Sequence, residues 1–174
     1  MFVAFFIFIG QNLFTQTVYV GSIDLNKKKN SFSLVSSSDS LLVKIDKKKL
    51  EFNAQKDFFF IKTRRDNYQL VYKGDTVKIK DSKKQIEFST GLIFFVAKKK
   101  SKNLILLDKN GKTMVNAKYE IKKHTAYYSL EIFENRYLKE LLAYSSYYLY
   151  TQSKNQYDSN NYYYLMYLYT MTYP

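Results

Sequence analysis

The side chains of this chain that could bind a ligand are mainly cationic, and they occur in clusters. Two arginines are adjacent, Arg64 and Arg65, and their planar guanidinium groups can each hold a phosphate by two hydrogen bonds. Lysine offers a phosphate only a point charge. The lysine runs are Lys27 to Lys29, Lys47 to Lys49, and Lys98 to Lys102. The candidate anion-binding residues are Arg64, Arg65, Lys47, Lys48, Lys49, Lys98, Lys99, Lys100 and Lys102.

The charge of the whole chain points to partners of the opposite sign. The formal net charge is +13, which attracts anionic lipid, nucleic acid or an acidic protein. The lysine runs all fall in expected turns, where the alternative interpretation is an ordinary solvated loop. Near an anionic membrane each lysine contributes about 1 kcal/mol, so clusters gathered at one end of the fold would suffice for binding. The same clusters scattered around the body would not.

Residues able to catalyse a reaction are sparse. The chain has no cysteine, which removes thiolate catalysis and cysteine-based zinc sites, and its one histidine, His124, cannot form a metal cluster alone. Asp75 and Asp81 are accounted for by turn chemistry. The sequence contains no phosphate-binding loop, dinucleotide fingerprint or nucleophile elbow. We therefore predict a protein that is not an enzyme and that needs no metal or cofactor.

Short β-type segments separated by turns fill most of the chain. This spacing is typical of a sandwich or barrel. We expect hairpins joining 41–45 to 50–52 and 58–61 to 68–72, and a third at Asn110-Gly111, where glycine supplies the positive φ of a tight turn. The expected strands are 17–23, 31–35, 41–45, 50–52, 58–61, 68–72, 76–79, 85–88, 92–97, 103–107, 112–117, 119–122 and 127–133.

One late segment, from Arg136 to Tyr150, is the expected helix around which the rest is organised. Its second half is apolar on nearly every side, and a helix of that kind is normally enclosed. Asn135 is the expected N-cap. The predicted fold class is therefore mainly β (a β-rich α+β protein), with an antiparallel twisted sheet or barrel packed around one late hydrophobic helix.

We expect one β-rich domain over residues 17–150, with different segments at either end. Residues 1–16 begin with MFVAFFIFI, which matches the apolar region of an export signal or an N-terminal strand of the core. Residues 151–161 are polar and linker-like, and residues 162–173 are aromatic and uncharged. Because large apolar patches are rarely exposed, docking of this tail on the body is favoured over exposure.

Several short motifs of the last third, within residues 90–150, occur in an order that resembles the tubby-like superfamily, which includes the scramblase and LURP-one-related proteins. The resemblance implies a closed antiparallel barrel around a central hydrophobic helix. It also implies a non-catalytic module that meets phosphoinositide or other anionic head groups through basic residues of the barrel wall. The central helix of that group is usually aliphatic, whereas this one is rich in tyrosine. The matching residues are Leu106-Leu107-Asp108 with Gly111-Lys112, Lys122-Lys123, Tyr128-Ser129-Leu130-Glu131-Ile132 and Leu141-Leu142-Ala143.

Two functions of different classes follow from the sequence. The first is peripheral binding of an anionic phospholipid or membrane surface by a non-catalytic domain, located in the cytoplasm or on a membrane. The alternative is an exported structural or interaction domain whose aromatic tail contacts a protein partner. Nucleic-acid binding is less favoured, because the aromatic residues sit in apolar runs and are expected to face the core instead of stacking on bases.

Overall fold

The computed structural model describes residues 16–26, 31–53, 58–100 and 102–172. The expectation of an export signal or strand over residues 1–16 falls almost wholly outside these residues. The elements are β1 (Thr17–Asp24), β2 (Ser31–Val35), β3 (Ser40–Asp46), β4 (Lys49–Asn53), β5 (Phe58–Arg64), β6 (Asn67–Tyr72), β7 (Asp75–Asp81), β8 (Gln85–Phe88), β9 (Ile93–Lys100), β10 (Asn103–Leu107), β11 (Thr113–Lys122), β12 (Thr125–Ile132), a 3₁₀ turn η1 (Asn135–Tyr137) and α1 (Leu138–Thr172).

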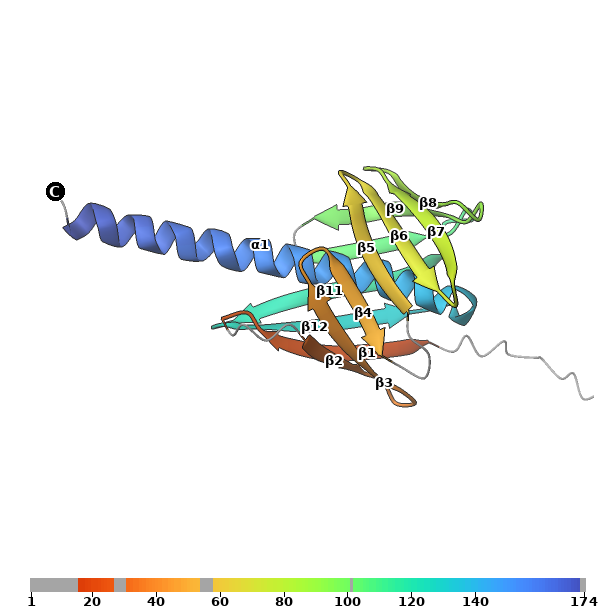
Figure 1. The fold of residues 1–174 in the computed structure, drawn as a ribbon, viewed down its shortest axis with the longest axis horizontal. Coiled ribbons are helices and arrows are strands. Elements are labelled where there is room, and N and C mark those ends of the chain that lie inside the picture. Colours follow the sequence, from red (N-terminus) through yellow and green to blue (C-terminus); the bar gives the residue numbers. More distant parts are fainter. Residues whose placement is uncertain (1–15, 27–30, 54–57, 101, 173–174) are drawn as a thin grey trace, which may run out of the picture.

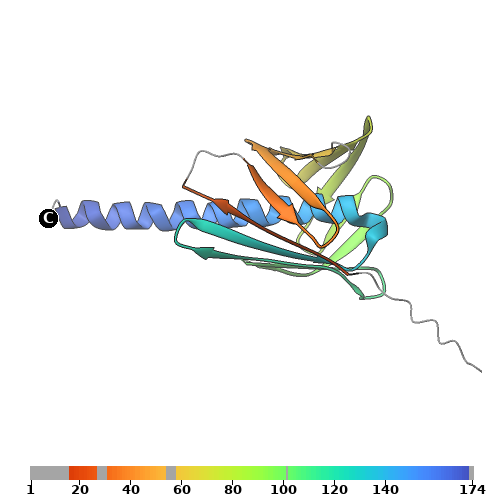
Figure 2. The same ribbon diagram turned by 90° about the horizontal axis from the view of Figure 1, so that it is seen from below.

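The strands form one closed antiparallel barrel in which each strand pairs with its neighbours in sequence and β12 closes onto β1. Helix α1 runs through the barrel and continues beyond it (Figures 1 and 2). The predicted mainly β fold around a late helix is therefore confirmed. The three expected hairpins are present as β3–β4, β5–β6 and β10–β11.

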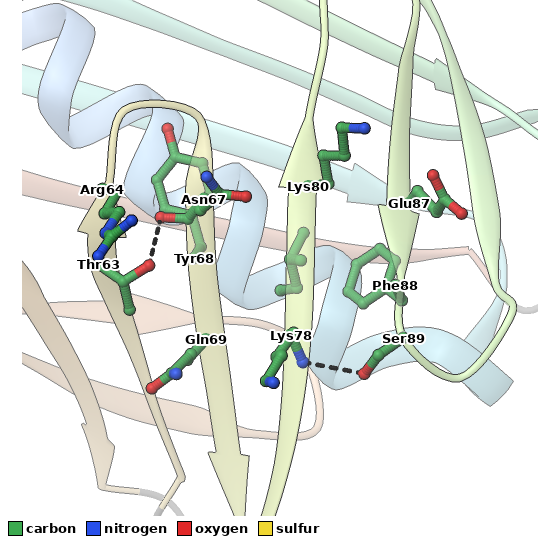
Figure 3. A pocket seen from close by; sticks show the side chains of 11 residues that line it. Thr63, Arg64, Asn67, Tyr68, Gln69, Lys78, Lys80, Glu87, Phe88 and Ser89 are labelled. Carbon is green, nitrogen blue, oxygen red and sulfur yellow. Dashed lines mark hydrogen bonds between the residues drawn. The ribbon is translucent and has the colours of Figure 1, made fainter.

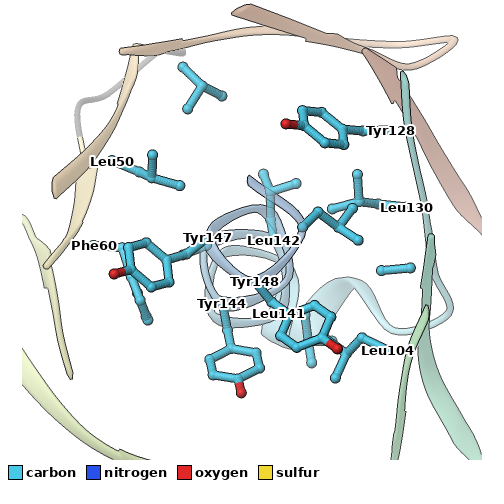
Figure 4. Packing of buried hydrophobic residues seen from close by; sticks show 14 of the residues in the cluster. Leu50, Phe60, Leu104, Tyr128, Leu130, Leu141, Leu142, Tyr144, Tyr147 and Tyr148 are labelled. Carbon is cyan, nitrogen blue, oxygen red and sulfur yellow. The ribbon is translucent and has the colours of Figure 1, made fainter. Parts of the chain in front are cut away.

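Apolar and polar residues alternate along the strands, and the apolar side chains line the inside of the barrel. In β3, for example, Leu41, Val43 and Ile45 are buried while Leu42 and Lys44 are exposed. The helix fills the interior: Leu141, Ala143 and Leu149 have no exposed surface. Figure 4 shows the helix seen from its end, with Leu142, Tyr144 and Tyr147 pointing in different directions toward the surrounding wall. The all-round apolar character of the helix is thus explained by enclosure on every side.

The backbones of β1 and β2 approach each other closely at Gly21. These two strands pair over only two positions, and Gly21 faces Leu34 there. A Cβ atom added to Gly21 would lie 2.4 Å from the backbone oxygen of Ser33, closer than two such atoms can approach. Glycine is therefore required at this position by the approach of the two backbones, a common use of glycine within strands.

The structure corrects three details of the sequence interpretation. Residues expected as two strands, 112–117 and 119–122, form the single strand β11, because Lys118 between them simply faces outward in a continuous ladder. The start of the helical region is capped by Glu134, whose carboxylate accepts from the backbone nitrogen of Arg136, and not by Asn135, which lies within η1. Lys98 to Lys100 extend β9 instead of forming a turn.

The last part of the described chain is one long helix, which removes the polar linker expected at 151–161. Ser153 and Tyr157 from that segment are buried, so its inward side still packs in the barrel. No glycine or proline occurs between Leu138 and Thr172 to interrupt the helix. Docking of the aromatic tail was also expected, but Tyr162, Tyr163 and Tyr164 are exposed on the part of α1 outside the barrel. Among the described residues, no helix is both long and apolar enough to span a bilayer.

Candidate functional site

The topology gathers six turns at one end of the barrel. In an all-antiparallel barrel with neighbours in sequence order, the turns that follow the odd-numbered strands all lie at the same end. These are the β1–β2, β3–β4, β5–β6, β7–β8, β9–β10 and β11–β12 connections. We call this the basic end, and the other the opposite end.

Helix α1 leaves the barrel through the basic end. At the opposite end, where it begins, the Lys139 ammonium lies 3.3 Å from the ring centre of Tyr72, the last residue of β6. Further along, the Tyr148 hydroxyl donates to the carbonyl of Asn103, at the start of β10, over 3.4 Å. Near the exit, Nδ1 of His124 in the β11–β12 turn lies 2.9 Å from the Tyr157 hydroxyl. The described parts of the six turns therefore lie at the end of the barrel where the helix leaves it.

The two ends differ in charge. Within the described residues, the turns of the basic end carry seven lysines and arginines against one acidic residue, Asp66. The described connections of the opposite end carry three lysines and three acidic residues. The basic residues of the basic end are Lys47, Lys48, Arg65, Lys83, Lys84, Lys102 and Lys123. Positive charge is thus concentrated around the helix exit, where a negatively charged surface would meet it.

The structure places the candidate residues predicted from the sequence in different surroundings. Lys47, Lys48, Arg65 and Lys102 are exposed in turns of the basic end, and Arg64 is exposed at the adjoining end of β5. Lys49 lies in β4, where it is 3.7 Å from a carboxylate oxygen of Glu51 and stacks on the Phe59 ring. Lys98 and Lys100 are exposed on β9, toward the basic end.

Lys99 differs from its neighbours because its ammonium points inward to a carboxylate. Its Nζ donates to Oδ2 of Asp81 over 2.6 Å, and the Tyr144 hydroxyl donates to the same oxygen over 2.7 Å. Asp81 is only 8% exposed, so this pair of donors supplies the partners that a buried carboxylate needs. Burial, together with the negative charge of Asp81, raises the pKa of Tyr144 well above 10. Lys99 is thus engaged inside the barrel wall.

The Asp81 network borders a polar cavity between the helix and the wall. The cavity is about 280 Å³ and is lined by Lys62, Asp81, Lys99, Tyr147 and Asn155 among others. A second depression of about 600 Å³ adjoins it at the basic end, lined by Arg65, Asp66, Lys83 and Gln152 together with Asp81 and Lys99. The two share residues, so polar and charged groups continue from the rim into the barrel.

The outer face of β5–β8 carries a separate depression of about 800 Å³. Figure 3 shows Arg64, Lys78, Lys80 and Glu87 around it. Lys78 and Lys80 alternate with the buried Ile79 along β7, which puts both on the outer face. The sequence interpretation did not single out Lys78, Lys80, Lys83 or Lys84. The Lys-Ile-Lys alternation would have identified the first two, and the turn at 81–84 the others.

Because several tyrosine side chains are buried, we expect the free energy of unfolding to fall at alkaline pH. Burial raises the pKa of Tyr128 and Tyr144 above 10, whereas in the unfolded chain both ionise near 10. Above pH 10 the unfolded state therefore binds fewer protons than the folded state. The stability contributed by each tyrosine is complete below pH 10, and it falls by up to about 1.4 kcal/mol per pH unit above that.

Urea unfolding at pH values on both sides of 10 measures this loss. The decrease in unfolding free energy per pH unit above pH 10 should be smaller in Tyr144→Phe than in the wild type. It should be unchanged in Tyr163→Phe, because Tyr163 is exposed. Phenolate absorbance measures tyrosine ionisation directly. If every tyrosine ionised near pH 10 while the protein remained folded, the prediction would be contradicted.

Comparison of the chain with protein families, curated proteins and solved structures gave no match in any of the three. The arrangement of charge and the cavities must therefore carry the functional argument. Within the described residues, no group of three or more histidine, cysteine, aspartate or glutamate side chains is placed to hold a metal ion.

Proposed function

We propose that this chain is a non-catalytic, tubby-like β-barrel domain that binds anionic phospholipid surfaces peripherally through its basic end. The observation that carries the proposal is the gathering of seven basic turn residues around the helix exit, against a balanced opposite end. At about 1 kcal/mol per lysine or arginine near an anionic surface, such a set is sufficient for reversible binding.

The arginine pair provides the best geometry for an individual head group. Arg65 lines the depression at the rim together with Lys83, and Arg64 lines the outer depression that also holds Lys80. A guanidinium flanked by a lysine can contact two oxygens of one phosphate while the lysine adds charge. This assigns general attraction to the turn lysines and orientation of head groups to Arg64 and Arg65.

The placement of the aromatic rings favours lipid over single-stranded nucleic acid as the partner. Stacking on bases requires rings exposed beside the basic groove. Most described tyrosine and phenylalanine side chains of the barrel are buried, and the large exposed aromatic side chains of its wall are Phe95 on β9 and Tyr127 on β12. The barrel surface therefore offers charge with few stacking platforms.

Charge reversal at the basic end tests the proposal. In Lys47→Glu/Lys48→Glu, the loss of two lysines alone removes about 2 kcal/mol, so binding to phosphatidylcholine vesicles containing phosphatidylserine should weaken by at least about 30-fold. Vesicle sedimentation measures the effect, and raising the salt concentration should weaken wild-type binding because the charges are screened.

A matched control lies at the opposite end. Lys73→Glu/Lys109→Glu makes the same change in net charge as Lys47→Glu/Lys48→Glu. Each double variant also alters one residue with positive φ, because Lys47 and Lys73 both have φ near 50°. This control should bind nearly as the wild type does. Equal binding to vesicles with and without phosphatidylserine, or equal losses in the two double variants, would refute a lipid-binding basic end.

A further inference from the structure

The part of α1 outside the barrel is a helix without charged side chains, bounded on its barrel side by an ion pair. Lys154 and Asp158 pair across one helical turn at 2.8 Å, and no aspartate, glutamate, lysine or arginine follows in the sequence. From Asp158 to the end of α1 at Thr172 the helix rises roughly 20 Å, at about 1.5 Å per residue. This extension projects from the centre of the basic end (Figures 1 and 2).

The extension displays aromatic surface on more than one side. Tyr162, Tyr163 and Tyr164 are 61%, 72% and 63% exposed, and Met166 is 47% exposed. Three successive residues of a helix point about 100° apart, so the three tyrosine rings cannot share one face. The barrel of the same molecule therefore leaves these three rings uncovered on more than one side of the helix, and a surrounding partner suits them better than a flat protein surface.

We infer that the extension inserts into one leaflet of an anionic phospholipid bilayer, with the basic end facing the head groups. This inference rests on the proposed function and deepens it by assigning the orientation of the domain. Charge complementarity favours an anionic membrane as the partner of the extension, because the lysines around its base lie where head-group phosphates would be. Tyr162, Tyr163 and Tyr164 lie within roughly 10 Å of Asp158 along the helix, at about 1.5 Å per residue. They would therefore lie just below the head groups, where an apolar ring with a hydroxyl that bonds to wet polar groups is favoured.

The length of the extension agrees with this depth. A bilayer is about 40–45 Å thick including head groups, so one leaflet is about 20 Å. An extension of roughly 20 Å therefore reaches into one leaflet while the turns of the basic end remain among the head groups. The domain would stand on the membrane with α1 directed into it.

A single tryptophan reports insertion, because the chain contains no tryptophan of its own. In Tyr163→Trp, the emission should shift to shorter wavelength on adding vesicles with phosphatidylserine, and brominated lipids should quench it. The control Val18→Trp places the reporter on β1 beside Glu131, at the opposite end, where the native valine is 41% exposed. Its emission should remain unchanged in the same vesicles.

A triple substitution separates insertion from electrostatic attraction. Tyr162→Gln/Tyr163→Gln/Tyr164→Gln keeps good helix formers and removes the rings. At low salt this variant should still bind through the basic end, whereas at high salt its binding should be at least about tenfold weaker than that of the wild type, because the apolar contribution is lost.

The outcomes distinguish the two proposals. If the wild type binds anionic vesicles through Lys47 and Lys48 but the reporter in Tyr163→Trp shows neither shift nor quenching, insertion is refuted and the proposed function stands. If no vesicle binding is seen, both fail. If light scattering shows a dimer that the triple variant abolishes, and the reporter does not respond to lipid, the extension is covered by a second copy of the chain and the inference is overturned.

Discussion

Replacing Leu149 by alanine should lower the free energy of unfolding by about 2–5 kcal/mol, the range for deleting a fully buried leucine side chain. Leu149 has no exposed surface, and it lies on the part of α1 enclosed by the barrel. The loss combines reduced burial of apolar surface with a cavity that the surrounding strands cannot fully close. Urea unfolding followed by circular dichroism measures it.

The matched control lies on the same helix outside the barrel. Tyr163→Ala removes a larger side chain that is 72% exposed, and it should change the stability by no more than about 0.5 kcal/mol. A small effect at Leu149, or a comparable effect at the two positions, would show that the helix is not enclosed as described.

Replacing Asp81 by alanine should lower the stability by about 2–4 kcal/mol. The substitution leaves the Lys99 ammonium, whose side chain is 26% exposed, without its counterion and leaves the Tyr144 hydroxyl without its acceptor. The expected loss is less than for a fully buried ion pair because water reaches Lys99 in part. Thermal or urea unfolding gives the value.

Two further variants identify the cause of that loss. Adding Lys99→Met to Asp81→Ala removes the unpaired charge and should restore part of the stability. Asp158→Ala breaks the exposed pair with Lys154, in which both side chains are more than a third exposed, and should cost less than about 1 kcal/mol. If Asp81→Ala cost no more than Asp158→Ala, the inward network would contribute no more than a surface pair.

Local patterns in the sequence predict the architecture well because the barrel is built from neighbours in sequence. Alternation marks strands such as β3, and the apolar residues from Leu141 to Leu149 require enclosure on all sides. The polar residues after Tyr150 predict a linker, but Ser153 and Tyr157 pack inside the barrel and hold the segment in the helix. Tertiary packing here overrides a weak local preference.

Whether the basic turns lie at the same end of the barrel depends on the number of strands between them. Local sequence patterns do not determine that number. Counting 112–117 and 119–122 as separate strands would move the turn at Lys122-Lys123 to the other end of the barrel. The continuous ladder of β11 with β12 restores it to the basic end. Likewise, a run of three lysines on β9 does not reveal that Lys99 turns inward to Asp81, which is 18 residues earlier in the chain.

The order of the elements constrains how the molecule can assemble. The first and last strands pair with each other, and a side-chain hydrogen bond joins Thr17 to Asn135, 118 residues away. The helix that fills the interior follows all twelve strands. Tyr144, Tyr147 and Tyr148 are buried inside the closed ladder, so the core is complete only when both the β1–β12 pairing and the helix are in place. Until then part of the core remains open to water, and exposed apolar surface of this kind promotes aggregation.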